Sequence, residues 1–234
     1  MSLTSHLQEL RSCLVNSCLA VAVGFAVCYA YVENLFFHLA APLTRINSPG
    51  LTLIGMAVTE VFLTEMKVAF VAGVFLALPV ILWQVWRFVA PGLYEHEKRY
   101  ARNFVFFGTL FFLLGAYFCY EVIFQAGFGF LLRRYEAIEV RPAIRVGEYL
   151  SFASDLVLAF GIAFELPVVA YFLTRIGLID HRFLIRQFRY AIIMILLLAA
   201  ILTPPDIVSQ ILLTLPLTLL YAVSIGVAYF AKAK

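Results

Sequence analysis

The sequence predicts an all-α polytopic membrane protein in which six helices cross the bilayer as a single domain, residues 1–234. Hydrophobic residues make up 64% of the chain, against about 45–50% in soluble domains. They occur in uncharged blocks close to the length of about 20 residues that a helix needs to cross the hydrocarbon core. The blocks lack the alternation of apolar and polar residues that a membrane β-barrel shows, so the spans are predicted to be helices.

The first predicted element is a short amphipathic helix at residues 1–13, before the first span. Its leucines recur at three- and four-residue spacing, and a serine or threonine is available to cap its start. We expect it to lie in the membrane interface, with Glu9 and Arg11 facing the headgroups. A plain solvated face with one orienting arginine remains an alternative.

Uncharged intervals then locate the spans, at about 14–32, 68–86, 103–120, 156–174, 190–202 and 207–231. The fifth interval has 13 residues, which gives about 20 Å of helix against a hydrocarbon core of about 30 Å. Either the bilayer thins there or neighbouring helices bury this segment. A tight turn should follow at Pro204, Pro205 and Asp206, because two consecutive prolines cannot continue a helix.

The distribution of basic residues predicts the orientation. With the N-terminus inside, the inner segments carry 11 of the 17 lysines and arginines. The positive-inside rule therefore places both termini in the cytoplasm. Aromatic residues flank the inner loop at 84–102, as an interfacial belt would: Trp83, Trp86, Tyr94 and Tyr100.

The outer loops, at about 33–66 and 121–154, are longer than the inner ones and contain prolines, including Pro42. Length together with turn-forming residues favours ordered structure, so we expect a cap outside the membrane.

Several function classes find no support in the sequence. The net charge of +3 is spread over several loops, which argues against nucleic acid as a partner. His96 and Glu97 resemble the start of a zinc motif, but Tyr100 stands where the second histidine is required. No nucleophile elbow, phosphate-binding loop or dinucleotide fingerprint is present. No metal, cofactor or enzymatic activity is therefore predicted.

Glu165 lies near the middle of the fourth span. A carboxylate at this depth costs about 2.5–3.5 kcal/mol on insertion scales, so such residues usually face a bundle interior or a wet cavity. It could join helices together, or it could line a polar cavity for which Gln210 is a second candidate. A proton-coupled secondary transporter using Glu165 is the alternative function, although the absence of internal repeats argues against it.

Six stretches carry a resemblance to a known family: HLQELR (6–11), APL (41–43), TEVFLTEMKVA (59–69), PVILWQVWRFVAPGLYEHEKR (79–99), FGIAFELPV (160–168) and LTPPDIVSQ (202–210). The chain resembles, over essentially its whole length, the TatC family, the core receptor subunit of the twin-arginine protein translocase. The resemblance implies a cupped bundle with short fifth and sixth helices, in the bacterial cytoplasmic (inner) membrane. It also implies export of folded proteins driven by the proton motive force.

The resemblance also assigns roles to residues. It implies that Glu9 and Glu97 bind the twin-arginine motif of signal peptides, although the sequence does not show whether the two converge. The remaining signal-peptide residues that it implies are Arg11, Phe88, His96 and Arg99, and the structural prolines are Pro42, Pro91, Pro204 and Pro205. Glu165, Asp206 and Gln210 match positions associated with an intramembrane cavity and with single-span TatA and TatB type subunits, in a homo- and hetero-oligomer.

Elementary chemistry agrees with the implied role of the two carboxylates. A guanidinium offers planar, paired donors that match a carboxylate, whereas a lysine ammonium is a point charge. Two carboxylates at a partly dry interface would therefore prefer Arg-Arg to Lys-Lys. Glu95 is expected to be a solvated neighbour.

Overall fold

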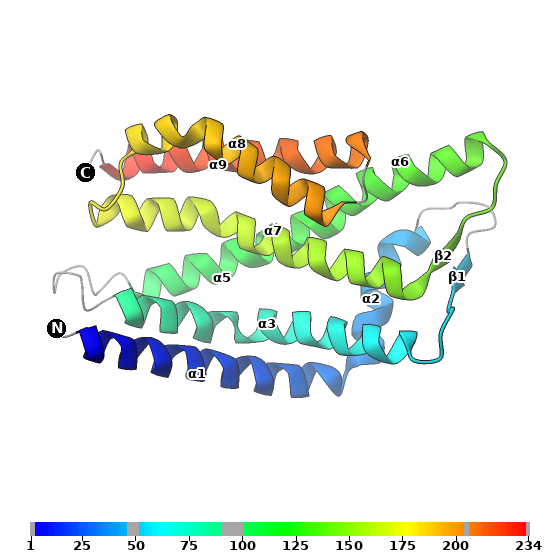
Figure 1. Ribbon diagram of the computed structural model, residues 1–234, viewed down its shortest axis with the longest axis horizontal. Helices are drawn as coiled ribbons and strands as arrows, with labels where there is room; N and C mark the ends of the chain where they lie inside the picture. The colour runs from blue at the N-terminus through cyan, green and yellow to red at the C-terminus, as the bar shows by residue number, and fades with distance from the viewer. Residues whose placement is uncertain (1–2, 46–51, 90–100, 204–205, 233–234) are drawn as a thin grey trace.

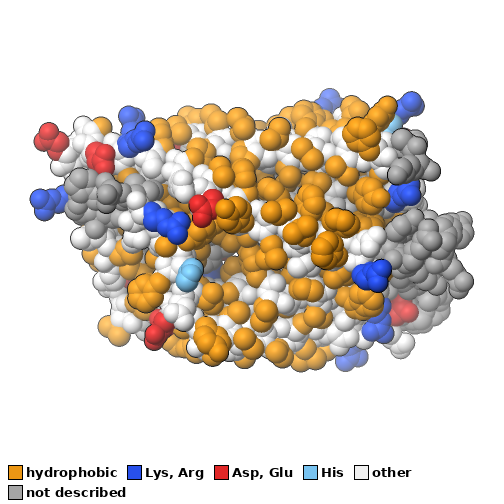
Figure 2. Space-filling model, turned by 180° about the vertical axis from the view of Figure 1, so that it is seen from behind, with side chains coloured by type: hydrophobic (Ala, Val, Ile, Leu, Met, Phe, Trp, Pro, Cys, Tyr) orange, Lys and Arg blue, Asp and Glu red, His pale blue; other side chains and the backbone are white. Residues whose placement is uncertain are grey.

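The computed structural model describes residues 3–45, 52–89, 101–203 and 206–232. Six of its helices are long and apolar enough to cross a membrane, which confirms the predicted fold class. Both termini lie at the same end of the bundle (Figure 1), here called the terminal end, and the opposite end is called the strand end. Hydrophobic side chains cover the middle of the face in Figure 2, while charged side chains gather toward its two ends.

The elements follow one another along the chain with short connections. The helices are α1 (Leu3–Tyr29), α2 (Val32–Arg45), α3 (Glu60–Val89), α5 (Ala101–Phe118), α6 (Phe124–Ala137), α7 (Val146–Arg175), α8 (His181–Leu202) and α9 (Ile207–Lys232). The strands are β1 (Thr52–Ile54) and β2 (Ala143–Arg145), and a π-helical turn, Cys119–Ile123, joins α5 to α6. The six candidate spans are α1, α3, the continuous α5–α6 helix, α7, α8 and α9.

Most helices extend beyond the uncharged intervals used to predict them. α3 and α7 have 30 residues each, and α8 has 22 instead of the expected 13 because its first turns contain three arginines. An uncharged interval measures only the apolar part of a span, and Lys, Arg and Glu are themselves good helix formers. α8 and α9, with 22 and 26 residues, are nevertheless shorter than α3 and α7.

The predicted amphipathic helix at residues 1–13 is not a separate element. α1 runs without a break from Leu3 to Tyr29, and no glycine or proline occurs before Gly24 to interrupt it. The segment therefore continues along the axis of the first span and does not turn into the membrane plane. Its Leu7, Leu10 and Leu14 are exposed on the outside of the bundle.

α1 packs on α3 at a crossing of two glycines. A Cβ atom on Gly24 would lie 2.5 Å from the carbonyl oxygen of Gly73, and one on Gly73 would lie 2.5 Å from the amide nitrogen of Phe25. The two backbones are thus in contact, which glycine permits and larger residues prevent. This contact between α1 and α3, here called the seam, determines the position of α1 relative to the other helices.

Aromatic side chains form much of the core in the terminal half. Trp86 lies 5.3 Å from Phe104 and 5.7 Å from Phe172, measured between ring centroids. Trp86 is buried whereas Trp83 is exposed, so the predicted aromatic belt is wrong for Trp86. Three neighbouring helices contribute these rings, and the packing that buries Trp86 is long-range. Tyr94 and Tyr100 lie outside the described residues.

Two parallel strands and one carboxylate fasten the segment before α3 to the segment before α7. β1 pairs with β2 so that Thr52 lies opposite Ala143. The Glu60 carboxylate accepts the backbone N–H of Met56 at 2.7 Å and of Gly147 at 2.9 Å. A Cβ on Gly147 would lie 2.7 Å from Glu60 Cγ, so this approach requires glycine. The described residues of the strand end therefore form ordered structure, whereas the position of this end outside the membrane stays a prediction.

Below the strands, Lys67 of α3 forms an ion pair with Asp155 of α7, with 2.7 Å between Nζ and Oδ2. Lys67 also donates a hydrogen bond to the Ser151 hydroxyl. The span predictions used Lys67 and Asp155 only as ends of apolar intervals. The structure shows that these ends face each other and connect two spans.

Pro42 stands inside α2 and not in a loop. Because proline has no N–H, the carbonyl of His38 lacks its helical donor. The hydroxyl of Tyr120 donates to that carbonyl at 2.8 Å, and the hydroxyl of Tyr149 donates to the neighbouring carbonyl of Leu39 at 3.1 Å. Pro42 thus leaves the His38 carbonyl free to accept a hydrogen bond from another element, and this bond helps to attach α2 to the rest of the molecule.

Candidate functional site

The first candidate site lies at the terminal end of the α1–α3 seam. Since α1 and α3 are antiparallel, the first turns of α1 lie beside the last turns of α3 (Figure 1). His6 stacks on Phe88, with 4.5 Å between ring centroids and 23° between planes. Glu9 follows on the same face of α1, with 4.0 Å between its Oε2 and His6 Nδ1. We call His6, Glu9 and Phe88 the rim cluster.

Glu9 is exposed on one side and enclosed on the other. Its side chain is 41% exposed, yet its Oε2 atom is buried and has no hydrogen-bond partner among the described residues. The α3-facing position explains this, because Cys13, one turn further, is buried as well. A carboxylate oxygen held away from water without a donor is unfavourable, and a cationic ligand would relieve that cost.

Arg11 does not belong to the rim cluster. It is exposed and stands two positions after Glu9, which places it about 200° around the helix. Conversely, His6 belongs to the cluster but was not among the predicted site residues. The sequence pointed to His6 only as the first residue of the HLQELR stretch. Its stacking on Phe88 depends on the packing of α1 against α3, which the sequence does not reveal.

Several predicted site residues lie outside the described residues, so their predictions stay predictions. They are Pro91, His96, Glu97, Arg99, Pro204 and Pro205. Glu95, predicted to be a solvated neighbour, also lies outside the described residues.

Glu165 lies at the junction of α3, α5 and α7. Both of its carboxylate oxygens are buried without a hydrogen-bond partner in the described part of the chain. A Cβ on Gly108 of α5 would lie 3.1 Å from Glu165 Oε2 and 2.7 Å from Leu82 of α3. The carboxyl group therefore occupies room left by a glycine, beside an apolar side chain.

Asp206 and Gln210 organise the hairpin of α8 and α9. The Asp206 carboxylate accepts the backbone N–H of Ser209 at 2.7 Å, as a helix N-cap does. The Gln210 side-chain amide donates to the carbonyl of Leu196 in α8 at 3.3 Å. Both side chains thus act within this hairpin.

The structure does not bring Gln210 and Glu165 together. Val227 of α9 lines the same pocket as Pro167 of α7, so it marks the level of α9 that lies beside Glu165. Gln210 is more than four helical turns earlier in α9, which separates it from Glu165 by about 20 Å along the bundle. In the described part of the chain, these two side chains therefore do not face one another.

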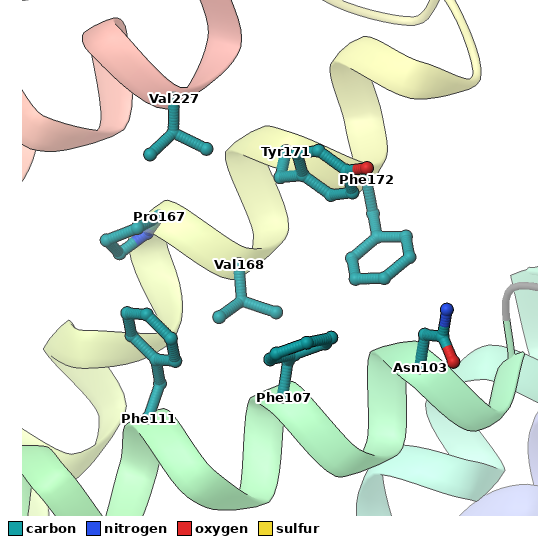
Figure 3. A pocket seen from close by; sticks show the side chains of 8 residues that line it. All are labelled: Asn103, Phe107, Phe111, Pro167, Val168, Tyr171, Phe172 and Val227. Carbon is teal, nitrogen blue, oxygen red and sulfur yellow. The ribbon is translucent and has the colours of Figure 1, made fainter. Parts of the chain in front are cut away.

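A pocket of about 290 Å³ opens between α5, α7 and α9 in the terminal half. In Figure 3, Phe107 and Phe111 of α5 reach toward Pro167 and Val168 of α7, and Val227 approaches from α9. Asn103 supplies an amide at one side. The walls are otherwise apolar, so the pocket suits a hydrophobic group.

Comparisons with known proteins agree over nearly the whole chain. The family model described as Sec-independent protein translocase protein (TatC) matches residues 5–216. The Sec-independent protein translocase protein TatC of Desulforapulum autotrophicum is 43% identical over 233 residues, which cover 99% of this chain and 86% of that protein. The protein of the same name from Carboxydothermus hydrogenoformans is 39% identical over 235 residues, covering 100% and 95%. A crystal structure of the twin arginine translocase receptor TatC has a TM-score of 0.89 at 37% identity, over 97% of this chain and 99% of that one.

Proposed function

The chain belongs to the TatC family of Sec-independent protein translocase proteins, and from this premise we propose that it is the receptor of a twin-arginine translocase. It recognises the twin-arginine signal peptides of folded proteins and acts as the scaffold of the machinery that exports them, driven by the proton motive force. It catalyses no chemical step itself. The relatives named above are translocase proteins, which gives no support to the alternative of a secondary transporter using Glu165.

The observation that carries this proposal is the rim cluster. At an accessible end of the bundle, next to the stacked rings of His6 and Phe88, Glu9 holds an enclosed carboxylate oxygen that has no hydrogen-bond partner among the described residues. A guanidinium would supply paired donors to this carboxylate and could also stack on an aromatic ring. Glu97 is proposed as the second carboxylate because its stretch of sequence resembles the family whose model matches this chain.

The same role implies an orientation and partners. The terminal end faces the bacterial cytoplasm, because the segments on that side carry most of the lysines and arginines. Single-span subunits of the TatA and TatB type and further copies of this chain complete the complex. Gln210, Asp206 and Glu165 are proposed as contacts or supports for those subunits.

The direct test is site-specific crosslinking from position 97 in native membranes. A peptide with an Arg-Arg signal should crosslink there, and a Lys-Lys peptide should crosslink much less. Glu97→Ala, read from a neighbouring crosslinking position, should reduce the Arg-Arg product more than Glu95→Ala does, because Glu95 serves as the matched control. Equal loss in the two variants, or full crosslinking of the Lys-Lys peptide, would contradict a specific arginine site.

A further inference from the structure

The start of α8 presents a row of arginines that the receptor role does not use. Arg182, Arg186 and Arg189 are all exposed, and their spacing places them within an arc of about 60° on one face of the helix. α8 contains no acidic residue along its 22 positions. We call these three residues the arginine row.

α8 is held mainly by one neighbour, α9, and only Ile195 and Ala199 of its side chains are buried. Its other faces are lined with exposed apolar residues, including Phe183, Ile185 and Ile193. No helix of the described chain covers these faces, so in a membrane they are open to lipid. The arginine row therefore stands beside side chains that lipid can reach.

None of the three arginines forms an ion pair with a described residue. Arg189 instead donates to the Tyr190 hydroxyl at 3.3 Å, and its guanidinium carbon lies 5.1 Å from the centre of that ring. Aromatic residues of this kind favour the headgroup level of a bilayer. The arginine row thus carries excess positive charge, and Tyr190 beside it indicates that the row lies at the membrane interface.

The length of α8 sets the depth of the row. From Tyr190 to Leu202 the helix is uncharged for about 20 Å, whereas the hydrocarbon core is about 30 Å thick. If the whole helix spans the core, the arginines begin within it, and if only the uncharged part does, the bilayer is thinned. In both cases guanidinium groups lie where lipid phosphates must approach them to compensate their charge.

We propose that Arg182, Arg186 and Arg189 form a binding site for the headgroup of an anionic phospholipid at the terminal end of α8. Guanidinium groups bind phosphate oxygens through paired donors. Positive charge is in excess there, because α8 has no carboxylate along its 22 positions and the Asp180 carboxylate that precedes it lies 2.7 Å from His181 Nδ1, which favours an anionic headgroup. The acyl chains then lie along the exposed apolar faces of α8.

The test uses the purified full chain in detergent, titrated with phosphatidylglycerol or phosphatidylcholine and followed by native mass spectrometry. The wild type should prefer phosphatidylglycerol. Each basic residue near a membrane surface contributes about a fivefold gain in affinity for anionic lipid, so the triple variant Arg182→Gln, Arg186→Gln, Arg189→Gln should bind phosphatidylglycerol on the order of 100-fold more weakly. Its phosphatidylcholine binding should not change.

Two further variants complete the experiment. The matched control is Arg133→Gln with Arg134→Gln, two exposed arginines of α6 at the strand end, and it should keep the preference. The triple lysine variant keeps the charge but not the paired donors, so it should still prefer phosphatidylglycerol while binding it more weakly than the wild type. This variant decides the case if the glutamine variant fails to fold. The proposal is overturned if the wild type shows no preference for phosphatidylglycerol, if the lysine variant binds it no better than phosphatidylcholine, or if the control loses as much as the glutamine variant.

Discussion

Glu9 and Glu165 each hold a carboxylate oxygen away from water without a hydrogen-bond partner among the described residues, but their surroundings differ. Glu9 is half-exposed beside stacked rings at one end of the bundle, so an arriving cation can reach it. Glu165 faces the glycine gap of α5 between three helices. The sequence identified both residues, because a motif and a mid-span charge are visible in it. It did not identify the pairing of His6 with Phe88, which depends on how two distant helices pack.

Replacing Glu165 tests whether it works in transport or only joins helices. Glu165→Leu removes a partnerless carboxyl group from an apolar junction, so the thermal midpoint in detergent should not fall. Signal-peptide crosslinking at position 97 should persist, whereas export of a folded reporter should drop. Glu165→Gln, which keeps the shape, serves as the control for packing. Normal export together with a lower midpoint would establish the purely structural role instead.

Among the elements, the long spans were predictable and their ends were not. Runs of apolar residues locate the part of a helix inside the membrane, but charged helix formers carry α3, α7 and α8 beyond it. α2 shows a different limit of sequence reasoning. Pro42 suggested a loop, yet the helix continues around it because tyrosines from two other elements bind the carbonyls of His38 and Leu39.

A double-mutant cycle tests this account of α2. Tyr120→Phe should destabilise the protein by about 1 kcal/mol, the usual net value of one hydrogen bond. In a Pro42→Ala background the same change should cost clearly less, because the restored N–H of residue 42 can bond to the His38 carbonyl. Chemical denaturation in detergent measures both differences. If Tyr120→Phe costs the same in the two backgrounds, the proline does not create the acceptor.

At the scale of the whole molecule, the rim cluster depends on a contact far from it. α1 is joined to the rest chiefly through α3, and the glycine crossing at Gly24 lies about 22 Å along the helix from Glu9. The number of spans and the shared end of the termini could be predicted from apolar blocks and charges. Which helices touch could not, since periodicity identifies a buried face but not its partner.

Gly73→Ala should therefore affect a function at the other end of the seam. The added Cβ would lie 2.5 Å from a backbone atom of α1, and such overpacking costs about 1–3 kcal/mol. We expect a lower thermal midpoint and weaker crosslinking of an Arg-Arg peptide at the rim. Gly226→Ala is the control, because a Cβ there meets nothing within 4 Å. Unchanged crosslinking in Gly73→Ala would show that the rim cluster does not depend on the glycine crossing between α1 and α3.

The ion pair between α3 and α7 also sets an order of events during synthesis. Lys67 precedes Asp155 by 88 residues, which a ribosome adds in about 4–18 s at about 5–20 residues per second. For that interval the nascent third helix carries a lysine without its counter-ion, and neither the strand pair nor the Glu60 bond to Gly147 can yet form. The first half of this protein therefore lacks these stabilising contacts until α7 has entered the membrane beside it.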